Sequence, residues 1–152
     1  MNSIRSLIPF QITQSPDGVN HAILTGRYGT IKLDTAPASP YAPVSVSSVN
    51  GFKLSLKTDY DDVTCFGDTN KVYIPGLRDI SGTLTGFWNS SELKIIEASS
   101  ATTPGYLELA PNSNEPSFIF GGLAYIDADL DCTLQAPKLS GTFKAAGPWV
   151  TP

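Results

Sequence analysis

The sequence has very little of what most catalytic and metal-binding sites are made from. Its 152 residues include one histidine, His21, and two cysteines, Cys65 and Cys132, which lie far apart in the chain. A structural zinc site takes four such ligands, so the sequence excludes a His/Cys metal centre. The cysteines are interpreted as small buried hydrophobic residues, with a disulfide between them as the alternative.

Other chemical signatures are missing as well. No basic residue stands beside Cys65 to lower the pKa of its thiol, and no nucleophile elbow surrounds any serine. The chain contains neither a GxxxxGK[ST] phosphate loop nor a GxGxxG fingerprint. We therefore expect a protein that is not an enzyme and that has no cofactor and no metal.

Charge is scarce too. Only 16% of the residues are charged, against roughly 25% in an average soluble domain, and the net charge is −4. The 10 lysines and arginines form no cluster, which argues against tight nucleic-acid binding. No apolar run is long enough to span a bilayer, and the N-terminal segment is too short and polar for a secretory signal, so we expect synthesis in a cytoplasm. A surface poor in charge is typical of proteins that pack against copies of themselves.

The sequence is rich in turn signals and in short segments that alternate between apolar and polar residues. This rhythm is typical of an all-β sandwich or barrel. We expect a single domain over residues 1–152, with residues 1–20 as an extended N-terminal arm. The strands are expected within residues 21–33, 52–57, 79–87, 124–134 and 138–144.

One segment, WNSSELKIIEASS at residues 88–100, predicts a helix. Asn89 is placed to cap it, and Glu92 follows three residues later, as in a capping box. Leu93 and Ile96 are spaced as a helical apolar stripe, with Trp88 as a packing partner just before the cap.

Acidic residues gather in two places. Residues 59–68 (DYDDVTCFGD) predict a solvated loop, with a calcium site that is not an EF-hand as the alternative. Asp127, Asp129 and Asp131 share one face of the 124–134 strand, because side chains alternate along a strand. That face is either an ordinary hydrated surface or a negative wall that repels a phosphate backbone.

Three phrases resemble a known family: DVTCFGDTNK (62–71), GLRDISGTLTGFW (76–88) and SGTFK (140–144). Over about residues 45–149 the chain resembles the major tail proteins, or tail tube proteins, of long-tailed bacteriophages. The resemblance implies a mainly β fold: a β-sandwich or barrel of two packed sheets with one short flanking helix and a long inter-strand loop or hairpin. It also implies that subunits join their sheets side by side into hexameric rings, and that the rings stack into a hollow tube.

The resemblance assigns roles to particular residues. Residues 57–77 take the place of the assembly loop that contacts adjacent subunits. The lumen of such tubes is negative, so the acidic face is the candidate for the lumen wall, whereas Lys53 and Lys57 are expected on another sheet face. The candidate interface residues are Tyr60, Val63, Phe66, Tyr73 and Ile74, and the candidate lumen residues are Asp127, Asp129 and Asp131.

The implied function is structural: a tube in the virion tail that conducts DNA into the host. Expected partners are copies of the chain, the tape measure protein and DNA in the lumen, and the tail terminator and distal tail or baseplate proteins at the ends. No membrane is expected, and assembly is expected in the host bacterial cytoplasm. Two rivals stay open: a capsid decoration or other head protein, and a carbohydrate-binding β-sandwich that uses Trp88 and Trp149 as stacking platforms.

Overall fold

A computed structural model describes residues 12–14, 20–22 and 28–152. The N-terminal arm expected over residues 1–20 lies almost entirely outside this part. Among the described residues, β1 (Ile12–Gln14) pairs antiparallel with β2 (Asn20–Ala22), which contains His21.

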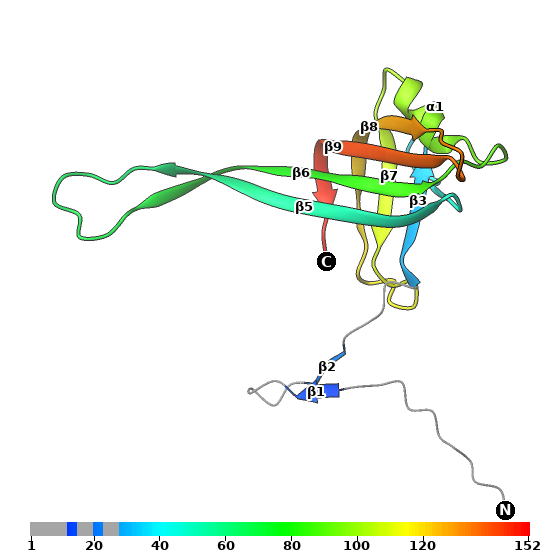
Figure 1. Ribbon diagram of the computed structural model, residues 1–152. Helices are drawn as coiled ribbons and strands as arrows, with labels where there is room; N and C mark the ends of the chain where they lie inside the picture. Colours follow the sequence, from blue (N-terminus) through cyan, green and yellow to red (C-terminus); the bar gives the residue numbers. More distant parts are fainter. Residues whose placement is uncertain (1–11, 15–19, 23–27) are drawn as a thin grey trace, which may run out of the picture.

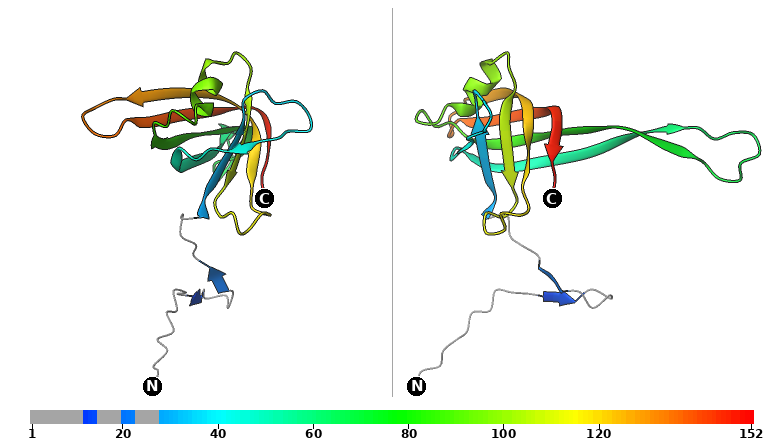
Figure 2. Two further views of the ribbon diagram at one scale, coloured as in Figure 1. Left: turned by 90° about the vertical axis from the view of Figure 1, so that its right-hand side faces the viewer. Right: turned by 180° about the vertical axis from the view of Figure 1, so that it is seen from behind.

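The body of the protein is one antiparallel sheet of seven strands in the order β4-β3-β7-β8-β9-β6-β5. The sheet bends on itself, so that β3 and β7 run across the direction of β5, β6 and β9 (Figures 1 and 2). A register shift between Gly122 and Ala124 interrupts the pairing of β8 with β9 near this bend. The prediction of a mainly β fold is confirmed, and its two layers are the two halves of a single sheet. The strands are β3 (Thr30–Asp34), β4 (Val44–Ser45), β5 (Val49–Asp62), β6 (Tyr73–Phe87), β7 (Gly105–Ala110), β8 (Phe120–Asp131) and β9 (Lys138–Val150).

The hydrophobic core lies between the two halves of the sheet. Leu33, Leu107 and Leu109 come from the β3–β7 half, and Leu84 and Phe143 from the other, and all five are almost fully buried. These positions follow the period-two alternation of their strands, because only one face of the sheet turns inward.

The helix forms where the sequence predicts one, but it starts later than expected. Helix α1 runs from Lys94 to Ser100 and has no side-chain cap at its first residue. Asn89 instead closes a turn: its side-chain oxygen accepts from the Ser91 amide at 3.0 Å, and its carbonyl accepts from the Glu92 amide at 3.0 Å. The capping-box prediction was therefore wrong, because Asx-turn geometry used the same donors. The buried side chains of α1 are Ile95 and Ala98, and the helix packs over β8, whereas Leu93 of the expected stripe is exposed.

Strands β5 and β6 extend well beyond the predicted ranges 52–57 and 79–87. Residues 57–77 are consequently a β-hairpin, in which only residues 63–72 lie between the strands (Figure 1). Pro75 and Gly76, a pair typical of turns, lie inside β6. Proline is acceptable in a two-stranded ribbon, because each strand there has an outer edge without a partner.

Candidate assembly surfaces

The hairpin projects far from the body (Figures 1 and 2). From here on we call its residues 58–77 the arm, which is separate from the N-terminal arm expected over residues 1–20. Cross-strand partners in the arm are Tyr60 with Pro75 and Asp62 with Tyr73. Partners that lie directly opposite share a face, so one face of the arm carries Tyr60, Tyr73 and Pro75 around a single carboxylate. Tyr60 is 64% exposed and Tyr73 51% exposed.

The opposite face of the arm also exposes apolar side chains, beside Asp61. Ile74 lies opposite Asp61, and the Val63 amide donates to the Val72 carbonyl at 2.9 Å one step further out. Val63, Val72 and Ile74 therefore share this face, and all three are exposed. An isolated ribbon with exposed apolar side chains on both faces is left without the packing that normally stabilises a hairpin.

Phe66 stands at the tip with its side chain fully exposed, and Leu77 at the base is almost as exposed. The structure thus brings together all five residues that the sequence placed in the assembly loop. Sequence reasoning missed Val72 and Leu77, although both are large apolar residues inside the same 57–77 range.

Internal hydrogen bonds order the tip of the arm. The Asp62 carboxylate accepts from the Thr64 amide and hydroxyl, and the Thr64 hydroxyl oxygen accepts from the Val72 amide at 3.0 Å. The Asp68 carboxylate accepts from the Cys65 amide at 2.8 Å. The bond from the Thr64 hydroxyl holds the pKa of Asp62 below its ordinary value, because it favours the charged carboxylate.

A second surface is the outer face of the four strands β8-β9-β6-β5. One row of cross-strand partners runs from Asp127 through Thr142 and Thr83 to Lys53. All four side chains are exposed, so Lys53 lies on the same face as Asp127. The expectation that the lysines occupy another face was wrong, because it depends on strand order, which single-strand patterns do not reveal.

Charges of both signs are therefore interleaved on this outer face. It carries four carboxylates and four ammonium groups, and a shallow groove of about 680 Å³ lies across it. The three candidate lumen aspartates do lie together on β8, but the face as a whole is not a uniformly negative wall. The charged residues are Asp79, Asp127, Asp129, Asp131, Lys53, Lys57, Lys138 and Lys144.

The same four strands have two open edges. β5 pairs only with β6, so its other edge has no strand beside it in the part of the chain that the structure describes. β7 pairs with β8 only along residues 120–124 of β8. The rest of β8, residues 125–131, has no partner strand on the side away from β9. Exposed edges are templates for pairing with another chain.

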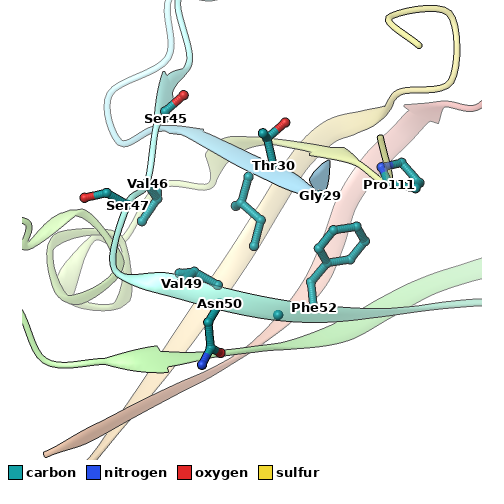
Figure 3. Close-up of a pocket in the computed structure, with 11 residues that line it drawn as sticks. Gly29, Thr30, Ser45, Val46, Ser47, Val49, Asn50, Phe52 and Pro111 are labelled. Carbon is teal, nitrogen blue, oxygen red and sulfur yellow. The ribbon is translucent and has the colours of Figure 1, made fainter. Parts of the chain in front are cut away.

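A second cavity, of about 670 Å³, opens between β3 and β5 (Figure 3). Val46, Val49 and Phe52 line it together with Thr30 and Pro111, and its lining contains no ionisable side chain. Its lining therefore holds no general acid or base beside the hydroxyl groups of Thr30, Ser45 and Ser47.

Both cysteines are exposed free thiols, Cys65 at the tip of the arm and Cys132 in the β8–β9 connection. The prediction that they are buried was wrong, because these segments leave the body where no core can cover them. Across the described residues no group of three or more His, Cys, Asp or Glu side chains could hold a metal ion. In the same part of the chain no helix has the length and apolarity needed to cross a membrane.

Trp149 is not placed as a sugar platform. Its ring stacks on the Phe143 ring with 5.7 Å between the ring centroids, and its Nε1 donates to the Leu123 carbonyl at 3.0 Å. The ring also lies directly over Gly122, where a Cβ would collide with it. Gly82 makes room for Phe143 in the same way, so these two strand glycines mark positions of close approach.

Comparison with solved structures identifies the fold. The tail of an empty gene transfer agent particle with C6 symmetry contains a chain with TM-score 0.71 at 15% identity, and the match covers 86% of this chain and 99% of that one. A chain in the virion of the native gene transfer agent gives TM-score 0.70 at 15% identity, with 86% and 99% covered.

The SPP1 tail tube, solved by solid-state NMR and cryo-EM, gives TM-score 0.67 at 14% identity and covers 86% of this chain and 80% of that one. No protein-family profile and no curated protein sequence matches the chain. The chain therefore has the fold of tail tube proteins, as the sequence resemblance implied.

Proposed function

We propose that this protein is a structural component of a virion tail, where copies of it form rings that stack into a tube. The observation that carries the proposal is the pair of open edges on the four strands β8-β9-β6-β5, next to an arm with exposed apolar side chains on both faces. The tail tube fold supports it, and the fold neighbours give no comparable support for the capsid and carbohydrate-binding alternatives.

The strand directions support ring formation. Successive strands of β8-β9-β6-β5 are antiparallel, so the first and last of the four run in opposite directions. When a copy is rotated about a common axis, its β8 arrives antiparallel to β5 of its neighbour and can continue the sheet. Such a head-to-tail contact closes into a ring when the rotation closes. Six copies per ring are proposed, in keeping with the C6 symmetry of the gene transfer agent tail.

Stacking is assigned to the arm. The arm leaves the sheet beyond Lys57 and Asp79, whereas the β8–β9 connection lies at the opposite end, beyond Asp131 and Lys138. From its base at Thr58 to the end of β5 at Asp62 the arm spans about 16 Å at strand rise, and residues 63–72 extend it further, towards a neighbouring ring. Because both of its faces expose apolar side chains, we propose that the arm is inserted between two surfaces of adjacent subunits.

The outer face of the four strands is proposed to line the lumen, with the three β8 aspartates among the groups that a passing DNA backbone meets. The tape measure protein would occupy the same lumen before ejection, and terminator and baseplate proteins would bind the two ends. The proposed role needs no catalytic residue.

The test is the assembly state of the purified chain. Electron microscopy and sedimentation velocity over a concentration series should reveal rings and hollow tubes with a constant diameter. A chain that remains monomeric at all concentrations, or that forms only compact trimers, would overturn the proposal.

A further inference from the structure

The two open edges of the four strands β8-β9-β6-β5 carry opposite charges on the same face. β8 presents Asp127, Asp129 and Asp131 along its unpaired stretch, and β5 presents Lys53 and Lys57 along its own. All five side chains are exposed, and none of them belongs to an ion pair within the described part of the chain. The charges therefore lie where a second copy would add its strand.

We propose that these charges select the partner edge and fix the register of the ring contact, an inference that rests on the proposed function. The occupant of each edge is a second copy of this chain. Opposite charges facing across antiparallel strands stabilise the pair, and like charges destabilise it. Pairing β8 with β8 would oppose carboxylates, and pairing β5 with β5 would oppose ammonium groups, so only the head-to-tail contact is favourable.

One register satisfies both lysines. Lys53 and Lys57 are four residues apart, as are Asp127 and Asp131. In an antiparallel contact, placing Lys57 opposite Asp127 of the neighbour automatically places Lys53 opposite its Asp131. Asp129 then lies opposite Ser55, diagonally between the two lysines. A slip of two residues in either direction leaves only one lysine opposite an aspartate.

The charges already fixed within each chain fit this register. Lys57 lies opposite Asp79 on its inner side, and Asp131 lies opposite Lys138. The contact would therefore create two rows of alternating sign: Asp79, Lys57 and the neighbour's Asp127 in one, and Lys53 with the neighbour's Asp131 and Lys138 in the other.

The register also fits the geometry of a closed sheet. Within one chain, the row of cross-strand partners that starts at Lys53 ends at Asp127. In the proposed contact, the residue beside Asp127 is Lys57 of the next copy and not its Lys53. The row is therefore displaced by four residues each time it crosses the four strands of one copy. This ratio of shear to strand number equals that of an eight-stranded barrel with shear 8, whose strands tilt by about 36°. Closed barrels fall within about 35–45°.

Disulfide trapping tests the register directly. In a Cys65→Ser, Cys132→Ser background, Ser55→Cys with Asp129→Cys should give intersubunit disulfides on mild oxidation, because opposed residues lie about 4.5–5.5 Å apart between Cα atoms. Within one chain these positions are separated by β6 and β9, about 14 Å, so the bond must join two copies. The matched control, Ser55→Cys with Tyr125→Cys, keeps both proposed Lys–Asp pairs, is four residues out of register on the same face of β8 and should crosslink about tenfold less.

Charge reversal tests the selection. Lys53→Glu with Lys57→Glu gives a chain with two acidic edges, and Asp127→Lys with Asp131→Lys gives one with two basic edges. Each alone should need at least about tenfold more protein to assemble, since two attractive pairs become repulsive. An equimolar mixture should assemble near the wild-type concentration. Circular dichroism spectra that match wild type establish that the variants fold.

The outcomes separate the two proposals. If the wild-type chain forms no rings or tubes, the proposed function fails. If the wild type assembles but the off-register pair crosslinks better, or both charge-reversed chains assemble alone as wild type does, the edge pairing proposed here fails and the tube remains.

Discussion

Phe66 offers the sharpest test of the arm. Its side chain is fully exposed at the tip, so Phe66→Asp removes no contact within the folded chain. We expect the free energy of unfolding to change by less than about 0.5 kcal/mol, as for other surface substitutions. Assembly should respond very differently, because burying a phenylalanine is worth about 1.5–3 kcal/mol per side chain.

That burial energy corresponds to a factor of about 10 to 100 in the affinity of each arm contact. Every subunit contributes one arm, so the concentration needed for tubes should rise by at least that factor. Sedimentation velocity and electron microscopy over a hundredfold concentration range measure this shift, and thermal unfolding followed by circular dichroism checks the fold. The adverse cost of placing a carboxylate in the contact adds to the effect.

Two controls frame the experiment. Phe66→Leu keeps an apolar tip and should assemble within a fewfold of wild type. Phe118→Asp places the same charge at another exposed phenylalanine, outside the arm, and should leave assembly unchanged. Normal tubes from Phe66→Asp at the wild-type concentration would refute the idea that the arm tip is buried on assembly.

Three further predictions concern the chain itself. Leu107→Ala, at a fully buried position, should cost about 2–5 kcal/mol in the free energy of unfolding, measured by urea denaturation. Gly82→Ala should cost about 1–3 kcal/mol by the same measurement, because the added methyl group collides with the Phe143 ring and the neighbouring strand. Thr64→Val should raise the pKa of Asp62 towards its ordinary value in an NMR titration. Because the pKa of Asp62 is lowered in the folded chain, the contribution of its carboxylate to tip order is present at neutral pH and is lost as the pH falls through the folded pKa. A lower protection of the Thr64 amide, measured as its exchange rate relative to the intrinsic rate at the same pH, should report this loss.

Sequence patterns predicted best where one side of a strand faces the core. The alternation over 124–134 located β8 because Ile126 and Ala124 are buried while their neighbours are not. It overran the strand end at Asp131, since Leu134 continues the alternation but lies fully exposed in the connection that follows. Alternation alone does not distinguish an apolar residue that packs into the core from one, such as Leu134, that is exposed in the single chain.

The candidate surfaces were only partly accessible to such reasoning. The arm's apolar residues could be named, but both of its faces are exposed, so no alternation marked how far β5 and β6 extend. The shared face of Lys53 and Asp127 depends on β6 and β9 lying between their strands. That order is a property of the assembled sheet, and no local pattern encodes it.

The arm and the β8–β9 connection leave opposite ends of the same four strands, and this gives any stack of copies a direction. One terminus of the stack would present a crown of unoccupied arms, and the other would present the vacant surfaces that receive them. A single capping protein could not fit both termini. Growth and length control would then need two chemically different partners. One would offer an apolar surface that binds the free arms, and the other would bind the surfaces that receive arms.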